Sequence, residues 1–81
     1  MIKPGFHFTN NDMELTVVSI FQAENDNVAL LVQNTSCPYL TVRSLSQEKN
    51  GNFTWVWGHY YNDFDIAIKD YRERLTSLSK D

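Results

Sequence analysis

The chain has 81 residues, of which 42% are hydrophobic and 21% are charged, and its formal net charge is −3 at pH 7. Such a composition is typical of one folded domain and excludes both a disordered segment and a disulfide-rich miniprotein. Lys and Arg form no cluster along the sequence, so we expect no direct binding of nucleic acid.

The first half of the chain predicts three strands joined by polar turns. Residues 5–8 form a short strand that leads into a turn at 9–12. Residues 13–22 are rich in β-branched and aromatic side chains, and residues 28–33 are continuously apolar, as expected of two longer strands. Residues 24–27 supply the Asn and Asp side chains that favour turns, so these two strands are predicted to form a hairpin.

The second half predicts two more strands, 39–46 and 53–61, joined by the dipeptide Asn50-Gly51. Asn-Gly is the dipeptide that best tolerates the positive φ angles of a type I′ turn. Such a two-residue turn fixes the register along both strands, although a bulge near Gly58 would shift its end.

This register predicts which side chains of the two strands share a face. One face collects Leu40, Val42, Trp55, Trp57, His59 and Tyr61. The other face collects Thr41, Arg43, Leu45, Thr54, Val56, Gly58 and Tyr60. We expect the first face to build the core beneath the helix that follows, so that both Trp are core residues rather than a platform for stacked bases.

From residue 62 the hydrophobic period changes from that of a strand to that of an amphipathic helix. Asn62 or Asp63 is expected to cap its start, and Asp70 and Arg74 to form an i, i+4 ion pair on its solvent side. Its apolar stripe consists of Phe64, Ala67, Ile68, Tyr71, Leu75 and Leu78. The predicted fold class is therefore α+β, an antiparallel β-meander of four to five strands with one C-terminal α-helix packed on one face, in a single domain spanning residues 1–81.

One helix covers one face of a sheet, yet the strand 28–33 is apolar on both faces. Because soluble proteins rarely expose a large apolar patch, the second face needs a cover. The sequence leaves two alternatives. Either a homodimer or another protein docks on the open face, or the N-terminal segment 2–8, which contains Phe6 and Phe8, folds back over it.

The sequence carries no recognisable catalytic, metal-binding or cofactor-binding motif. Cys37 and His59 have catalytic potential, but nothing in the sequence pairs the thiol with a base, so an enzyme that uses either residue is the least favoured function. His7, His59 and Cys37 lack the short-spaced ligand pairs of a zinc site, and we expect neither a metal nor another cofactor.

Two features bear on where the protein is found. The N-terminal residues 1–5 lack the apolar stretch of a signal peptide, and no apolar run approaches the length of a membrane span. Cys37, the single cysteine, cannot form an internal disulfide, which favours a reducing compartment. We therefore expect a cytoplasmic protein with no membrane contact.

Residues 39–75 carry a resemblance. The strand Tyr39-Leu40-Thr41-Val42-Arg43 is followed by the run Trp57-Gly58-His59-Tyr60-Tyr61 and then by Asp63-Phe64, Ala67 and Tyr71-Arg72-Glu73-Arg74. This pattern resembles small uncharacterised proteins of plasmids, phages and conjugative elements of Gram-positive bacteria, in which a strand ending in Trp-x-x-Gly-x-Tyr runs into a C-terminal helix. The resemblance implies a mobile-element context, where small acidic proteins often bind host or defence proteins, and it carries over no functional residues.

The favoured function is that of a small non-enzymatic protein–protein interaction or accessory protein of a bacterial mobile element. Its expected partner is another protein, and a homodimer is the alternative. Arg and Tyr are enriched at interface hot spots. The predicted register places Arg43, Val56 and Tyr60 on the face that the helix leaves open, and His59 lies at the strand-to-helix corner. The candidate contacts are Arg43, Val56, Tyr60 and His59.

An alternative function is an inhibitor of a host defence nuclease, of the anti-CRISPR or anti-restriction type, which presents an acidic surface in place of nucleic acid. The residues for such a surface are Asp12, Glu14, Glu24 and Asp26. This alternative requires the four carboxylates to cluster on one surface of the folded chain.

Overall fold

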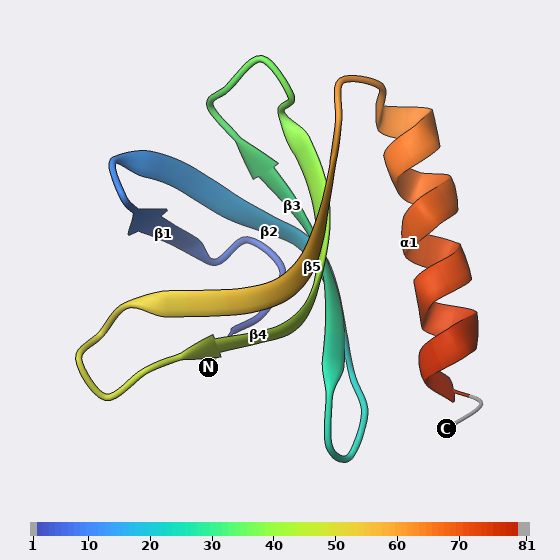
Figure 1. Cartoon of the computed structure of the whole chain (residues 1–81), viewed down its shortest axis with the longest axis horizontal. Coiled ribbons are helices and arrows are strands. Elements are labelled where there is room, and N and C mark those ends of the chain that lie inside the picture. Colours follow the sequence, from blue (N-terminus) through green and yellow to red (C-terminus); the bar gives the residue numbers. More distant parts are fainter. Residues whose placement is uncertain (1, 80–81) are drawn as a thin grey trace.

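The computed structural model describes residues 2–79 and shows a curled sheet with a helix beside it (Figure 1). Within this range five strands form one antiparallel sheet in the order of the sequence, which confirms the predicted α+β meander. The elements are β1 (His7–Asn10), β2 (Met13–Gln22), β3 (Asn27–Gln33), β4 (Tyr39–Gln47), β5 (Phe53–Tyr61) and α1 (Phe64–Ser79). Across these same residues, no helix has both the length and the apolar character that a bilayer crossing demands.

Helix α1 packs on one face of the sheet, mainly against β3 and β4 (Figure 1). Asp63 is its N-cap, because its Oδ1 accepts hydrogen bonds from the amides of Asp65 at 2.8 Å and Ile66 at 3.3 Å. The predicted apolar stripe forms the contact with the sheet, and Phe64, although 41% exposed, packs edge-on against Tyr39 of β4 with ring centroids 5.2 Å apart. The residues of this layer are Val28, Leu30, Ala67, Tyr71 and Leu78, with Ala23, Tyr39, Tyr61, Ile68 and Leu75 partly buried around them.

The other face of the sheet is covered by the chain's own N-terminal segment. The sheet curls until the ring of Phe8 in β1 lies 4.3 Å from that of Phe53 in β5, and Phe6 packs beside both. The amide of Gly5 donates to the carbonyl of Val17, and the amide of Val17 donates to the carbonyl of Phe6, so the segment is tied to β2. Of the two alternatives for this face, the N-terminal cover is the one observed, and the expectation of an apolar face free to dock a partner is wrong.

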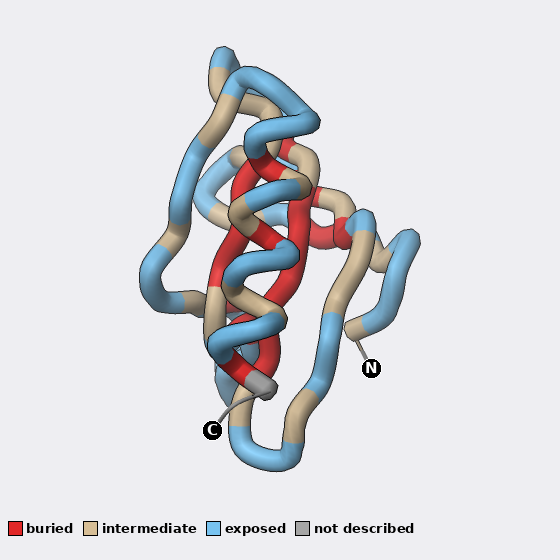
Figure 2. Tube along the Cα trace, turned by 90° about the vertical axis from the view of Figure 1, so that its right-hand side faces the viewer, coloured by how far each residue is buried: buried red, intermediate tan, exposed pale blue. Residues whose placement is uncertain are grey.

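The larger core lies under this cover. Its buried members are Phe8, Leu15, Val17, Ala29, Leu31, Leu40, Val42, Leu45 and Phe53. Figure 2 shows that buried positions concentrate in the central strands behind the helix, whereas the hairpin ends are exposed. Functional side chains are therefore expected at the hairpin ends and along the edges of the sheet.

The type I′ turn lies at Asn11-Asp12, not at Asn50-Gly51. Asn11 and Asp12 both have positive φ angles, of 50° and 68°, and β1 pairs with β2 directly on either side of them. In the β4–β5 hairpin the positive φ is that of Gly51, at 91°, and the amide of Glu48 bonds to the carbonyl of Asn52. That hairpin therefore closes around three residues instead of two.

The extra turn residue shifts the predicted register by one position. Leu40 pairs with Tyr60 rather than with Tyr61, and a shift of one residue exchanges the two faces of a strand. As a result Leu40 and Val42 lie in the core beneath the N-terminal segment, on the face away from α1. The prediction that both Trp lie beneath the helix is wrong: Trp55 packs on the far core, and Trp57 is 68% exposed.

Trp55 and Tyr60 close over Gly58 in the edge strand β5. A methyl group at Gly58 would lie 3.2 Å from Nε1 of Trp55 and 3.2 Å from two atoms of the Tyr60 ring and hydroxyl. The three residues occupy the Trp, Gly and Tyr positions of the Trp-x-x-Gly-x-Tyr pattern. The spacing of that pattern therefore has a packing explanation, because the glycine leaves room for two aromatic side chains on an exposed strand.

Candidate functional site

Two β-bulges face each other in the middle of the β4–β5 hairpin. The register shifts on both sides of Arg43, which leaves Arg43 and Val56 as an isolated pair. Ser44 and Trp57 have backbone φ angles of 57° and 50°, values that residues other than Gly, Asn and Asp rarely adopt. Left-handed backbone at such residues costs on the order of 1–2 kcal/mol each, and strain of this kind concentrates at functional sites.

The bulge of β5 presents a Trp side chain to solvent. Trp57 is 68% exposed and Val56 is 47% exposed, and the guanidinium carbon of Arg43 lies 5.6 Å from the centre of the Trp57 ring. Nη2 of Arg74 in α1 donates a hydrogen bond to the carbonyl of Trp57, so the helix holds the bulge from behind. We name the group formed by Arg43, Val56 and Trp57 the double-bulge surface.

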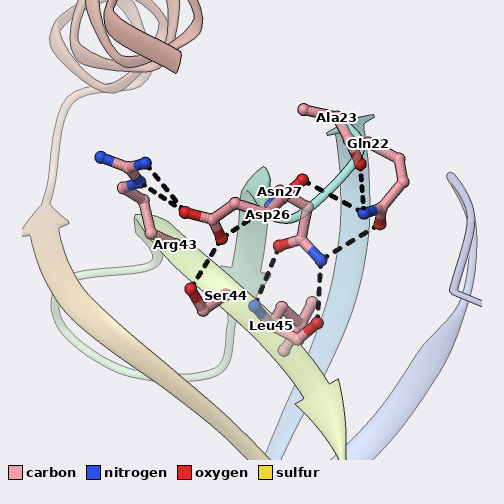
Figure 3. A network of polar contacts seen from close by, with 7 residues as sticks. All are labelled: Gln22, Ala23, Asp26, Asn27, Arg43, Ser44 and Leu45. Atoms are coloured by element: carbon pink, nitrogen blue, oxygen red, sulfur yellow. Dashed lines mark hydrogen bonds and ion pairs between the residues drawn. The ribbon is translucent and has the colours of Figure 1, made fainter. Parts of the chain in front are cut away.

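The bulge of β4 is tied to the β2–β3 turn through Asp26 (Figure 3). The Asp26 carboxylate accepts hydrogen bonds from Nη2 of Arg43 at 2.8 Å, from the hydroxyl of Ser44 at 2.6 Å and from the amide of Asn27 at 2.8 Å. Burial alone would raise the pKa of Asp26, but these hydrogen bonds and the Arg43 charge outweigh it and hold the pKa below 3.8. Arg43 is therefore fixed between an ionised carboxylate and the ring of Trp57.

Asn27 repairs the sheet where the bulge interrupts it. Its side-chain amide accepts a hydrogen bond from the amide of Leu45 at 2.9 Å and donates one to the carbonyl of Leu45 at 3.0 Å, as a paired residue of a neighbouring strand would (Figure 3). It also donates to the side chain of Gln22 at 3.3 Å. The buried Asn27 therefore satisfies backbone groups that β3 no longer reaches.

A groove of about 610 Å³ adjoins the double-bulge surface, between the β2–β3 turn and the C-terminal end of α1. We name it the hairpin groove. It is lined by Phe21, Ala23, Glu24, Asn25, Asp26, Arg43 and Leu78. Because Arg43 belongs to both the groove and the double-bulge surface, the two form one continuous site.

A second polar cluster lies between β4, β5 and α1. The hydroxyl of Thr41 donates to the carboxylate of Asp70, Nδ1 of His59 lies 3.1 Å from the same oxygen, and Nε of Arg74 lies 3.5 Å from it. Burial would raise the pKa of Asp70, but the hydrogen bonds from Thr41 and His59 and the charge of Arg74 bring it below 3.8. The predicted Asp70–Arg74 pair therefore exists, but it is buried against the sheet, not on the solvent side, with side-chain exposures of 16% and 11%.

Burial also shifts two neighbours of Asp70. Loss of hydration lowers the pKa of Arg74, against the opposing charge of Asp70, and burial together with Asp70 raises the pKa of Tyr61. Arg74 stays a cation because its ordinary pKa is so high. The cluster joins α1 to β4 through Thr41 and to β5 through His59 and the carbonyl of Trp57, and these contacts indicate a structural role.

The two depressed carboxyl pKa values predict how stability depends on pH. Asp26 and Asp70 both titrate below 3.8 in the folded chain, so their stabilising effect is complete above that value and is lost as the pH falls through the folded values. We expect the free energy of unfolding to be steady near about pH 6 and to fall below about pH 4. Urea unfolding at stepped pH measures this, and an unchanged free energy at about pH 3 would contradict it.

The candidate catalytic residues do not line a site. His59 is half exposed at the rim of the Asp70 cluster, and Cys37 is half-buried in the β3–β4 loop, where its carbonyl accepts hydrogen bonds from the side chains of Gln33 and Thr35. Neither residue lines the hairpin groove or the shallower hollow on the other side of the β2–β3 turn. Among residues 2–79, no three His, Cys, Asp or Glu side chains gather closely enough to hold a metal ion.

The four acidic candidates separate into two pairs. Asp12 belongs to the turn before β2, and Glu14 lies next to it, 3.6 Å from His7. Glu24 and Asp26 lie beyond the other end of the ten-residue β2, and Asp26 is paired with Arg43. The arrangement therefore gives no single surface that contains all four carboxylates.

The four interaction candidates are also divided between two faces. Arg43 and Val56 pair on the side of the sheet that carries α1, and His59 lies on that side too, against Asp70. Tyr60 pairs with Leu40 and points to the opposite side, over Gly58. Trp57 is not among the candidates predicted from the sequence, because no sequence feature marks the paired bulges that turn it outward.

Comparison of the chain with protein-family models, with curated protein sequences and with solved structures gave no match. The site is therefore defined by its own geometry.

The strain at Trp57 is testable by comparing two substitutions. Trp57→Gly and Trp57→Ala both remove the ring, but glycine alone adopts a φ of 50° without strain, so we expect the Gly variant to be the more stable by about 1 kcal/mol. Val56→Gly and Val56→Ala are the control, because at an ordinary strand position Ala is the more stable by roughly 0.5–1 kcal/mol. Urea unfolding measures the free energy of unfolding of the four variants. If the Gly and Ala variants ranked in the same order of stability at both positions, the strain at Trp57 would be refuted.

Proposed function

We propose that this protein is a non-enzymatic interaction protein that binds another protein through the double-bulge surface. One observation carries the proposal: a strained backbone holds the Trp57 side chain 68% exposed beside Arg43. Trp and Arg are the residue types that contribute most at interface hot spots. An exposed Trp held at a cost in backbone strain adds nothing to the core, so a binding role explains it better than a packing role.

The geometry also reduces the cost of binding. Arg43 is held by two hydrogen bonds to Asp26 and by the Trp57 ring, and the Trp57 carbonyl is held by Arg74. A contact surface whose side chains are already ordered loses less conformational entropy when the partner docks. The surface is therefore preorganised as a small anchor, with the hairpin groove beside it.

The setting of this function is part of the proposal. The resemblance of residues 39–75 supports a bacterial mobile element, and the single Cys37 supports a cytoplasmic location. The partner is another protein of the same cell, and a second copy of the chain is the alternative occupant of the same surface. A nuclease inhibitor has less support because its carboxylates lie at opposite ends of β2. An enzyme has less support because neither His59 nor Cys37 lines the hairpin groove or the hollow on the other side of the β2–β3 turn.

An affinity pull-down from the source cell tests the proposal. We expect Trp57→Ala to weaken capture of the partner by about 30-fold, the effect of removing a hot-spot residue. Tyr60→Ala is the matched control, because Tyr60 is an exposed aromatic residue of the same strand on the opposite face. Retention of the partner by Trp57→Ala, or equal loss with both variants, would contradict the proposal, and light scattering of the same proteins reports whether the partner is a second copy.

A further inference from the structure

The hairpin groove has apolar walls that end at a charged rim. Figure 1 shows the β2–β3 hairpin and the C-terminal end of α1 side by side. Ala23 of the hairpin packs against the apolar cluster that contains Leu78 of α1, and both residues line the groove. Phe21, at the end of β2, adds an aromatic wall and is 42% exposed. Such walls suit the aliphatic stem of a long side chain, because burying its methylene groups is favourable without any polar partner.

The charges of the groove leave an unbalanced carboxylate. Arg43 and Asp26 neutralise each other through contacts of 2.8 Å and 3.2 Å, and Asp26 is further satisfied by Ser44 and Asn27. Glu24, on the rim, is exposed and forms no hydrogen bond or ion pair with any described residue. With Glu24 and Asp26 against Arg43, the groove carries one net negative charge.

We propose that the hairpin groove binds an arginine or lysine side chain of the protein that docks on the double-bulge surface. The aliphatic stem of that side chain lies along Phe21, Ala23 and Leu78, and its cationic head meets the carboxylate of Glu24. This inference rests on the proposed function, since Arg43 places the groove directly beside Trp57. Charge complementarity disfavours an acidic segment in the groove, because it would face Glu24, and the described residues that line the groove offer no free cation to receive it.

Binding of a short probe peptide tests the inference on the intact chain. Acetyl-Leu-Arg-Leu-amide is titrated into isotope-labelled protein up to about 10 mM, a range suited to a weak single-side-chain contact. We expect chemical-shift changes at the amides of residues 21–26 and at Leu78, and none with acetyl-Leu-Glu-Leu-amide. Changes of equal size with both peptides, or no changes with the Arg peptide, would overturn the inference.

Substitution of the rim carboxylate supplies the second readout. Glu24→Gln is expected to weaken binding of the Arg peptide by about threefold or more, as loss of one partly exposed ion pair does. Glu48→Gln is the matched control, because Glu48 is an exposed carboxylate in the β4–β5 turn. Equal affinity for Glu24→Gln and the unaltered chain would overturn the inference.

The two proposals fail separately. If the Arg peptide does not bind while Trp57→Ala still loses the partner in the pull-down, the groove inference is wrong and the proposed function stands. If the peptide binds and Trp57→Ala keeps the partner, the groove recognises a basic side chain but the double-bulge surface is not the docking site.

Discussion

Replacing Asp70 with Asn is expected to lower the free energy of unfolding by about 3 kcal/mol, because it leaves a buried guanidinium without a counter-charge. The Arg74 side chain is 11% exposed, and its Nη1 is already buried without a hydrogen-bond partner. The carboxylate also accepts from Thr41 and contacts His59, so those groups lose an ionic partner as well. Urea unfolding at neutral pH measures the change.

Two further variants sharpen this prediction. Asp65→Asn makes the same substitution in the first turn of the same helix, at an exposed position where loss of a helix-dipole contact costs less than about 1 kcal/mol. Adding Arg74→Leu to Asp70→Asn removes the stranded charge and is expected to recover much of the loss, because an apolar side chain replaces a buried pair at little cost. If Asp70→Asn costs no more than Asp65→Asn, Asp70 does not stabilise Arg74 as described.

The sequence was sufficient to predict the fold class and the order of the elements, although the first strand is His7–Asn10 rather than residues 5–8. Strands β2 and β5 have the predicted bounds, and the helix has the predicted cap and stripe, because hydrophobic period and capping chemistry are local properties. The cover of the second face was one of two predicted alternatives. It required Phe6 and Phe8 to reach Phe53, a contact between the two ends of the sheet that no local pattern specifies.

The site could not be predicted because it depends on register. Asn50-Gly51 favours a two-residue turn, yet the hairpin closes around three residues. The bulge in β4 then shifts the pairing by one further position, and the bulge in β5 shifts it back. Each bulge is stabilised by a residue far away in the sequence. The carboxylate of Asp26 accepts a hydrogen bond from the hydroxyl of Ser44, and the guanidinium of Arg74 donates one to the carbonyl of Trp57. Tertiary contacts of this kind override local turn preference, which is why Trp57 is exposed and not in the core.

Among uncharged polar side chains, the largest effect is expected at Asn27. Asn27→Ala is predicted to lower the free energy of unfolding by about 2–4 kcal/mol, because the amide and carbonyl of the buried Leu45 both lose their partner. These bonds support the sheet where β4 bulges. Since that bulge positions Arg43, the same variant should also weaken binding at the double-bulge surface, measured in the pull-down beside urea unfolding.

Asn25→Ala is the control for Asn27, because Asn25 lies in the same turn but is exposed, and its loss should cost less than about 0.5 kcal/mol. Asn27→Asp separates hydrogen bonding from shape. It keeps an acceptor for the Leu45 amide but cannot donate to the Leu45 carbonyl when ionised, so it should be destabilised at neutral pH and should recover as acid protonates the new carboxyl. That recovery runs opposite to the acid loss expected of the unaltered chain. Similar free energies of unfolding for Asn25→Ala and Asn27→Ala would show that the Asn27 amide does not replace the missing strand contact.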